Sequence, residues 1–112
     1  MSRERAANEI DEVELEKIVA AIVRLAEPEK LILFGSAARG EMTPDSDLDF
    51  LVIKRGVHRR HLAREIRKSL GLRFYPIDIL VVHPEDVEHY GDSPFLVYRA
   101  ALEEGRVVHD AG

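Results

Sequence analysis

The stretch that decides the fold is LILFGSAARGEMTPDSDLDFLVI, residues 31–53. Its first four residues are all apolar, which is typical of a strand covered on both faces. Gly35 ends this run, because a residue without a Cβ atom allows another group to approach the backbone closely. Ser36 follows at the start of a predicted short helix, where free N–H groups and the helix dipole favour an anion. The pattern predicts a strand, a phosphate-binding turn, a short helix, a loop and a second strand.

Two aspartates lie at the start of the second predicted strand. Alternate residues of a strand share a face, so Asp47 and Asp49 are expected to point the same way. The rest of the strand is apolar, and two neighbouring carboxylates there repel each other and resist burial. A hard divalent cation such as Mg²⁺ would relieve both costs. The alternative is a solvated face of an edge strand that holds no metal.

A third carboxylate follows in the next apolar run, residues 76–82, where Asp78 is the sole charged residue. On a third strand beside the second, Asp78 would complete a cluster for two metal ions. The alternative is a structural ion pair with an arginine such as Arg39 or Arg73.

These residues resemble a known family. Gly35-Ser36, then Asp47-x-Asp49, then the lone Asp78 resemble the signature of the DNA polymerase beta-like nucleotidyltransferase superfamily. The fuller strings GSAARG and SDLD resemble its minimal, or MNT-type, branch. The resemblance implies an α/β (α+β) domain with the nucleotidyltransferase fold, in which helices pack on a small mixed sheet. Residues 1–112 would then form a single minimal nucleotidyltransferase domain.

The resemblance also implies a Mg²⁺-dependent reaction that moves a nucleoside monophosphate, AMP from ATP, onto an acceptor hydroxyl. It implies a helical partner of the HEPN type, for which the chain acts as antitoxin by complex formation and by adenylylation. Ala37 stands where relatives often carry a larger cationic or aromatic residue, which leaves Arg39 as the nearest cation for the phosphates. The residues assigned to catalysis and to two Mg²⁺ ions are Asp47, Asp49 and Asp78, and those assigned to the nucleotide are Gly35, Ser36 and Arg39.

Two other functions fit the same residues. The chain could be a binding module that neutralises or regulates a helical partner by contact alone. It could also transfer a nucleotide to a small molecule or to an RNA end. The 112 residues leave no room for the additional helical domain that holds the acceptor in larger relatives.

Composition excludes several classes of protein. The chain is 46% hydrophobic and 33% charged, which is typical of a soluble globular protein. The sequence contains no apolar run of about 18 residues that could span a membrane, and its acidic start is not a signal peptide. It contains no cysteine, so disulfides, thiol catalysis and cysteine-bound zinc are excluded. A cytoplasmic location is expected.

The remaining elements follow from apolar periodicity and from breakers. The patterns predict helices over residues 11–26, 58–70 and 93–104, a helical turn from Pro84 and strands over 73–82 and 106–109. Pro76 inside the third strand indicates an edge position or a bulge. Pro44, Asp45 and Ser46 are ordinary turn residues.

Charge is unevenly distributed along the chain. Residues 54–73 hold 8 basic and 1 acidic side chains, between two acidic blocks, in a chain of net charge −5. This basic block predicts a solvated helix face or a contact for an acidic partner, and a nucleic-acid footprint remains open. His58 and His61 are spaced i, i+3, but the neighbouring arginines would repel a shared metal ion, so a solvated face is favoured.

Overall fold

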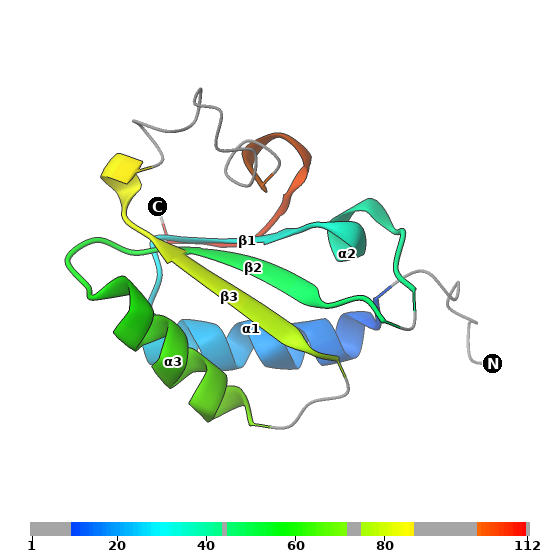
Figure 1. The fold of residues 1–112 in the computed structure, drawn as a ribbon, viewed down its shortest axis with the longest axis horizontal. Coiled ribbons are helices and arrows are strands. Elements are labelled where there is room, and N and C mark those ends of the chain that lie inside the picture. Colours follow the sequence, from blue (N-terminus) through cyan, green and yellow to red (C-terminus); the bar gives the residue numbers. More distant parts are fainter. Residues whose placement is uncertain (1–9, 44, 72–74, 87–100, 112) are drawn as a thin grey trace.

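The computed structural model describes residues 10–43, 45–71, 75–86 and 101–111 (Figure 1). Within these ranges, the labelled helices and strands mostly alternate along the chain. They are α1 (Glu12–Ala26), β1 (Lys30–Phe34), α2 (Ser36–Arg39), β2 (Leu48–Ile53), α3 (Arg59–Leu70), β3 (Ile77–Val82) and β4 (Arg106–Asp110).

The four strands form one mixed sheet in the order β3-β2-β1-β4. β1 pairs antiparallel with both β2 and β4, whereas β2 and β3 run parallel. The parallel pair needs a crossover, and α3 provides it. The predicted α/β fold with a small mixed sheet is therefore confirmed.

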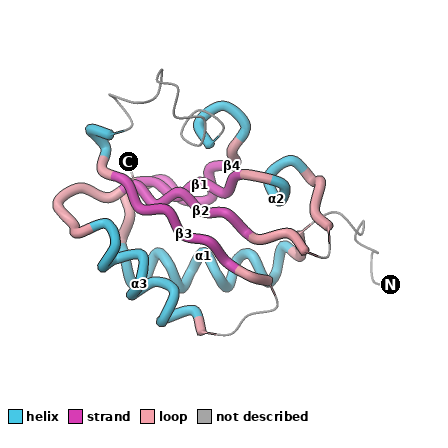
Figure 2. The backbone as a smooth tube through the Cα atoms, in the orientation of Figure 1, coloured by secondary structure: helices cyan, strands magenta, loops and turns pink. Residues whose placement is uncertain are grey.

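Helices α1 and α3 cover one face of this sheet, as Figure 2 shows. Side chains alternate between the faces, so Leu33 and Phe50 enter the main core with α1 and α3. Ile32 and Leu51 point to the opposite face, where they pack with Ala101 in a second, smaller cluster. The strand residues 48 and 50–53 all belong to one of the two cores.

Helix α1 confirms the predicted amphipathic helix over residues 11–26. Asp11 is its N-cap, because the carboxylate accepts hydrogen bonds from the N–H groups of Val13 and Glu14. The helix ends at Ala26, and Glu27 adopts a left-handed conformation with φ 45° before Pro28.

Helix α3 begins one residue later than predicted, at Arg59. His58 is the N-cap: its ring nitrogen Nδ1 accepts a hydrogen bond from the N–H of His61 at 3.2 Å. The His58 side chain therefore has a local structural role as a helix cap. Gly71 follows the helix with φ 62°, as predicted for its C-cap.

The third strand is shorter than predicted. β3 begins at Ile77, and Pro76 precedes it, where its carbonyl accepts a hydrogen bond from the N–H of Leu48 at 2.9 Å. A proline has no N–H to donate to a sheet, which explains why the strand starts after it. The predicted edge position is confirmed, and residues 72–74 lie outside the described part of the chain.

The C-terminal elements agree with the prediction where the structure describes them. Residues 84–86 and 101–104 are helical, and the strand predicted over 106–109 extends to Asp110. The predicted helical residues 87 and 93–100 lie outside the described ranges. Among the residues that the structure describes, no helix has both the length and the apolar character that crossing a membrane requires.

Candidate active site

The site begins where β1 ends, at the turn between Phe34 and α2. Gly35 has φ 73° and ψ −154°, a conformation that L-residues rarely adopt. Its Cα also lies against the Asp49 carboxylate, and a Cβ at this position would collide with Asp49 Oδ2. Glycine is required at this position both for the backbone turn and for the close approach of the carboxylate.

Gly35, and not Ser36, occupies the N-cap position of α2. A capping role therefore does not account for Ser36. Ser36 is the first helical residue, and its hydroxyl makes no hydrogen bond to any part of the chain that the structure describes. The hydroxyl thus remains available to a ligand beside the turn.

Asp49 and Asp78 are brought together by the parallel pairing of β2 and β3. They are direct register partners, and strand alternation places them with Leu51 and Leu80, on the face of the sheet opposite α1 and α3. Asp49 is half-buried, and Asp78 is exposed on the edge strand. Acidic residues that stand opposite each other in a sheet destabilise it, so this pairing calls for a chemical explanation.

Asp47 lies just before β2, which begins at Leu48. The prediction that both aspartates share the strand was therefore wrong by one residue. The side chain of Asp47 is exposed, and strand alternation does not fix its direction. It nevertheless lies close enough to Asp49 to influence its ionisation.

The electrostatics of the site concentrate on Asp49. Partial burial raises the pKa of the Asp49 carboxyl, and the negative charges of Asp78 and Asp47 raise it further. Arg39 acts in the opposite direction, but its effect is smaller. Among the described residues, no hydrogen bond or ion pair engages any of the three carboxylates. The site thus holds negative charge that Arg39 offsets only in part.

Arg39 is the last residue of α2, and two other acids hold its guanidinium. Its Nε donates to Glu41 Oε1 at 2.9 Å, and its Nη1 lies 3.6 Å from Glu104 Oε2. The ion pair between Asp78 and Arg39, considered as an alternative, is not present, and Arg73 lies outside the described residues. Sequence reasoning missed both glutamates: the proximity of Glu41 to Arg39 was a signal, whereas nothing local indicated Glu104.

The loop between α2 and β2 is the ordinary turn that its composition predicts. The Ser46 side chain accepts a hydrogen bond from the N–H of Thr43 at 2.8 Å, and the N–H of Ser46 donates to the carbonyl of Thr43. Asp45 is exposed in this turn. The turn returns the chain to Asp47 and the start of β2.

A family model described as "Nucleotidyltransferase domain" matches residues 14–75 of the chain. This chain belongs to the nucleotidyltransferase family. The match includes the Gly35-Ser36 turn and both Asp47 and Asp49, and it ends three residues before Asp78. The case for Asp78 therefore rests on its register with Asp49 in the sheet.

Individual relatives agree with this assignment. A Methanocaldococcus jannaschii protein named "Putative protein adenylyltransferase MJ0604" is 32% identical over 80 residues, which are 71% of this chain and 77% of that protein. A structure described as a "putative nucleotidyltransferase from Sulfolobus solfataricus" aligns with a TM-score of 0.58 at 16% identity, over 88% of this chain and 79% of that one. A structure described as "the toxin-antitoxin with AMP-PNP" aligns with a TM-score of 0.55 at 20% identity, over 85% of this chain and 73% of that one. The two structural likenesses establish the fold.

A nucleotidyltransferase generally uses a divalent cation, and the residues present fit one by their chemistry. Carboxylate oxygens are the ligands that Mg²⁺ prefers, and Asp49 and Asp78 are adjacent and without a cationic partner in the described chain. Across the described ranges, however, no three acidic or histidine side chains converge as they would around an ion. Asp49 and Asp78 are thus the best supported ligands, and Asp47 would have to turn toward them.

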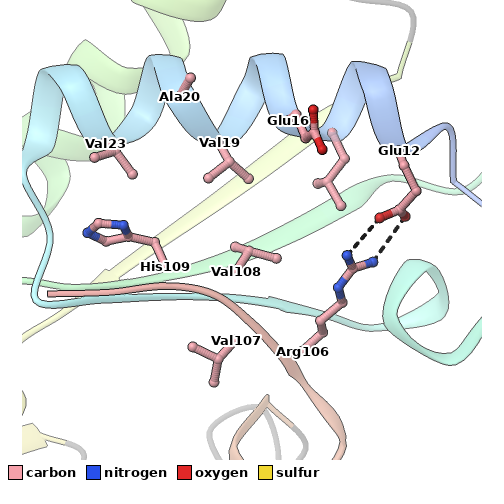
Figure 3. Close-up of a pocket in the computed structure, with 10 residues that line it drawn as sticks. Glu12, Glu16, Val19, Ala20, Val23, Arg106, Val107, Val108 and His109 are labelled. Atoms are coloured by element: carbon pink, nitrogen blue, oxygen red, sulfur yellow. Dashed lines mark hydrogen bonds and ion pairs between the residues drawn. The ribbon is translucent and has the colours of Figure 1, made fainter. Parts of the chain in front are cut away.

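Two hollows of the nucleotidyltransferase lie away from these acids. One, of about 430 Å³, runs between α1 and β4 and is walled by Val19, Val23 and Val108 (Figure 3). Its polar end is closed by Arg106, which donates to both Glu12 oxygens at 3.0 and 2.7 Å and thereby lowers the pKa of Glu12. The other lies at the start of α3, beside His83. Neither hollow includes Asp47, Asp49 or Asp78.

Proposed function

We propose that this nucleotidyltransferase moves AMP from ATP, with Mg²⁺ and with release of pyrophosphate, onto a hydroxyl of a protein partner, a HEPN-type helical toxin, and so acts as its antitoxin. The observation that carries the proposal is the Asp49 carboxylate, which lies between Gly35 and Asp78 and has no cationic partner in the described chain. A nucleotide site needs a turn that admits phosphate beside acids that hold a cation, and both meet at this carboxylate.

The relatives support the acceptor and the partner. One relative is named a protein adenylyltransferase, and one structural neighbour is a toxin–antitoxin assembly with an ATP analogue. A protein hydroxyl as acceptor and a toxin as partner are therefore the most economical choices. ATP and Mg²⁺ are both abundant in the cytoplasm, where we place the reaction.

The proposed roles follow from position. The Ser36 hydroxyl and the backbone N–H groups at the start of α2 bind the terminal phosphates, and Gly35 keeps the approach to Asp49 open. Asp47, Asp49 and Asp78 hold the metal. Bound Mg²⁺ would neutralise phosphate charge and lower the pKa of the acceptor hydroxyl. Arg39 must leave Glu41 and Glu104, at least in part, before it can bind phosphate.

Transfer can be tested with two differently labelled nucleotides. The protein is incubated with Mg²⁺ and a lysate of its source organism, and with ATP labelled either at the α- or at the γ-phosphate. We expect one protein to gain the α-label and not the γ-label, and Asp49→Asn to abolish the gain. Labelling from the γ-phosphate would mean phosphoryl transfer, and a lysate that gains no label would refute the enzymatic proposal.

A second function, neutralisation by contact alone, is favoured by one observation. Arg39 is held by two glutamates, and the three aspartates do not converge, so the site as it stands is not assembled for catalysis. Neutralisation of the toxin by Asp49→Asn would separate the two functions. If this variant still neutralises the toxin fully, the protein acts by contact. If the variant fails, the wild type acts by transfer.

A further inference from the structure

Helix α3 presents a row of cations on its exposed side. Arg60, Arg64, Arg67 and Lys68 are spaced i, i+4, i+7 and i+8, which places them on one face of a helix. At a rise of 1.5 Å per residue, the row is about 12 Å long. The opposite face of α3 carries Ala63, Ile66 and Leu70 and is buried. We call these four cations the basic stripe.

The basic stripe differs from the other cations near α3 because nothing in the described chain neutralises it. Arg55 pairs with Glu29 at 2.8 Å, and Arg59 pairs with Asp86 at 3.0 Å. Among the described residues, none of the four stripe side chains has such a partner, although the whole chain carries a net charge of −5. Four like charges in a row repel one another, and an acidic surface would remove that cost.

Two other kinds of anionic partner fit poorly. A lipid surface would need the apolar face of the helix, but Ile66 and Leu70 are already buried against the rest of the fold. Nucleic-acid-binding domains are commonly basic overall, whereas this chain has a pI near 5.5, and α3 contains no Phe, Tyr or Trp on which a base could stack. An acidic protein surface remains the partner that the stripe fits.

The position of the stripe connects it with the active site. Helix α3 packs against β3, the edge strand that carries Asp78, and leads through residues 71–76 into that strand. Asp78 is exposed and, by strand alternation, lies on the opposite face of the sheet from α3. A protein that binds the stripe and also extends around the β3 edge would meet Asp78, and would leave the Gly35-Ser36 turn open to nucleotide.

We propose that the basic stripe is the docking surface for the acceptor protein, and that this partner presents an acidic surface to it. The partner and acceptor roles rest on the proposed function, but the charge of the surface does not. Docking through α3 would hold the acceptor against the domain while its hydroxyl reaches the carboxylates at the edge strand.

The test uses a fluorescein-labelled poly-glutamate peptide as a probe of acidic protein surface. Binding is measured by fluorescence anisotropy for the wild type and for the stripe variant Arg60→Glu/Arg64→Glu. We expect the stripe variant to bind the peptide about tenfold more weakly, and the wild-type affinity to fall as salt is added. The control Lys17→Glu/Arg24→Glu makes the same change of net charge on the exposed side of α1, and we expect less than a twofold effect.

Three outcomes decide the proposal. An equal loss of peptide affinity in the stripe variant and in the control would show a bulk charge effect. If the wild type does not bind the peptide, the stripe is not a docking surface for acidic proteins. Either result overturns the proposal. Tighter binding of single-stranded RNA of equal charge would overturn it in favour of a nucleic-acid site. Binding of ATP and Mg²⁺ is measured on the same samples, so that failure of the proposed function is seen separately from failure of the stripe.

Discussion

The two ends of the β2–β3 pair carry opposite kinds of contact. Toward the end of β2, Leu51 stands opposite Leu80 and Val52 opposite Val81, and both β2 residues are completely buried. At its start, Asp49 stands opposite Asp78. A single ladder of hydrogen bonds thus joins an apolar, stabilising segment to a pair of like charges.

This difference shows how the domain separates stability from chemistry. The apolar pairs are satisfied by each other, so they need nothing from outside the chain. The acidic pair has no such partner in the described chain, and we propose that a cation satisfies it. Asp49 thus lies only two residues from the core residue Leu51.

The largest effect is expected from substitutions on each side of that boundary. Asp49→Asn should reduce transfer by about a hundredfold or more, because it removes a central ligand, and should leave folding intact. Leu51→Ala should lower the free energy of unfolding by about 2–5 kcal/mol, because it opens a cavity in the core. Labelled-nucleotide assays and urea denaturation measure the two effects.

Either of two results would contradict this separation of stability from catalysis. An Asp49→Asn protein that loses as much stability as Leu51→Ala would show that the acid has a structural role. An active Asp49→Asn protein would remove the acid from the catalytic site.

Gly35→Ala is expected to have the next largest effect on transfer. The added methyl group would collide with Asp49 Oδ2, and a φ of 73° is strained for alanine, so transfer should fall roughly tenfold or more. Gly71→Ala is a matched control, because Gly71 has nearly the same backbone conformation, φ 62° and ψ −151°, but no atom within 4 Å of the added Cβ. A similar loss of transfer in both variants would assign the effect to backbone strain instead of to the crowded carboxylate.

The pH dependence of the free energy of unfolding should report the ionisation of the Asp49 carboxyl. The pKa of Asp49 is raised in the folded state from an ordinary value of 3.8, so the folded protein binds this proton more tightly than the unfolded chain does. Stability then falls as pH rises from the unfolded pKa through the folded pKa, and stays lower above it. We expect Asp49→Asn to lack this decline and Mg²⁺ to reverse it in the wild type. Thermal unfolding from pH 3 to pH 7 measures both, and a wild-type curve that coincides with the variant's would contradict the expectation.

The smallest effect is expected at Glu104, which lies on the second face of the sheet. Glu104→Gln should remove the ion pair between Glu104 and Arg39 and so tighten ATP binding. Because an exposed ion pair is weak, we expect an effect of only about two- to fivefold. Glu85→Gln is the control, because Glu85 is an exposed acid at the far end of β3. Equal affinities in the wild type and in Glu104→Gln would show that Glu104 does not compete with phosphate for Arg39.

Much of this fold could be predicted because its signals are local. The apolar run after Lys30, the glycine that ends it and the cap residues of α1 each act within a few positions. The start of β2 was placed one residue early, because alternation of side chains does not define where a strand begins. The shortened β3 has a local cause in Pro76, whose effect on the boundary was underestimated.

What could not be predicted depends on contacts between distant segments. The parallel direction of β3, and with it the register of Asp49 with Asp78, is decided by packing of α3 and not by any local pattern. The contact of Arg39 with Glu104 joins residues far apart in sequence, so no spacing rule could indicate it. The candidate residues were found from the sequence, whereas their electrostatic relations required the structure.

We have proposed that the Gly35-Ser36 turn and the aspartates form one Mg²⁺-dependent nucleotide site. Calorimetric titration with an ATP analogue that cannot be cleaved between its α- and β-phosphates, with and without Mg²⁺, measures this property. We expect the wild type to bind the analogue only with Mg²⁺, and Asp49→Asn/Asp78→Asn not to bind it. Equal binding by the wild type and the double variant, or binding that is indifferent to Mg²⁺, would contradict it.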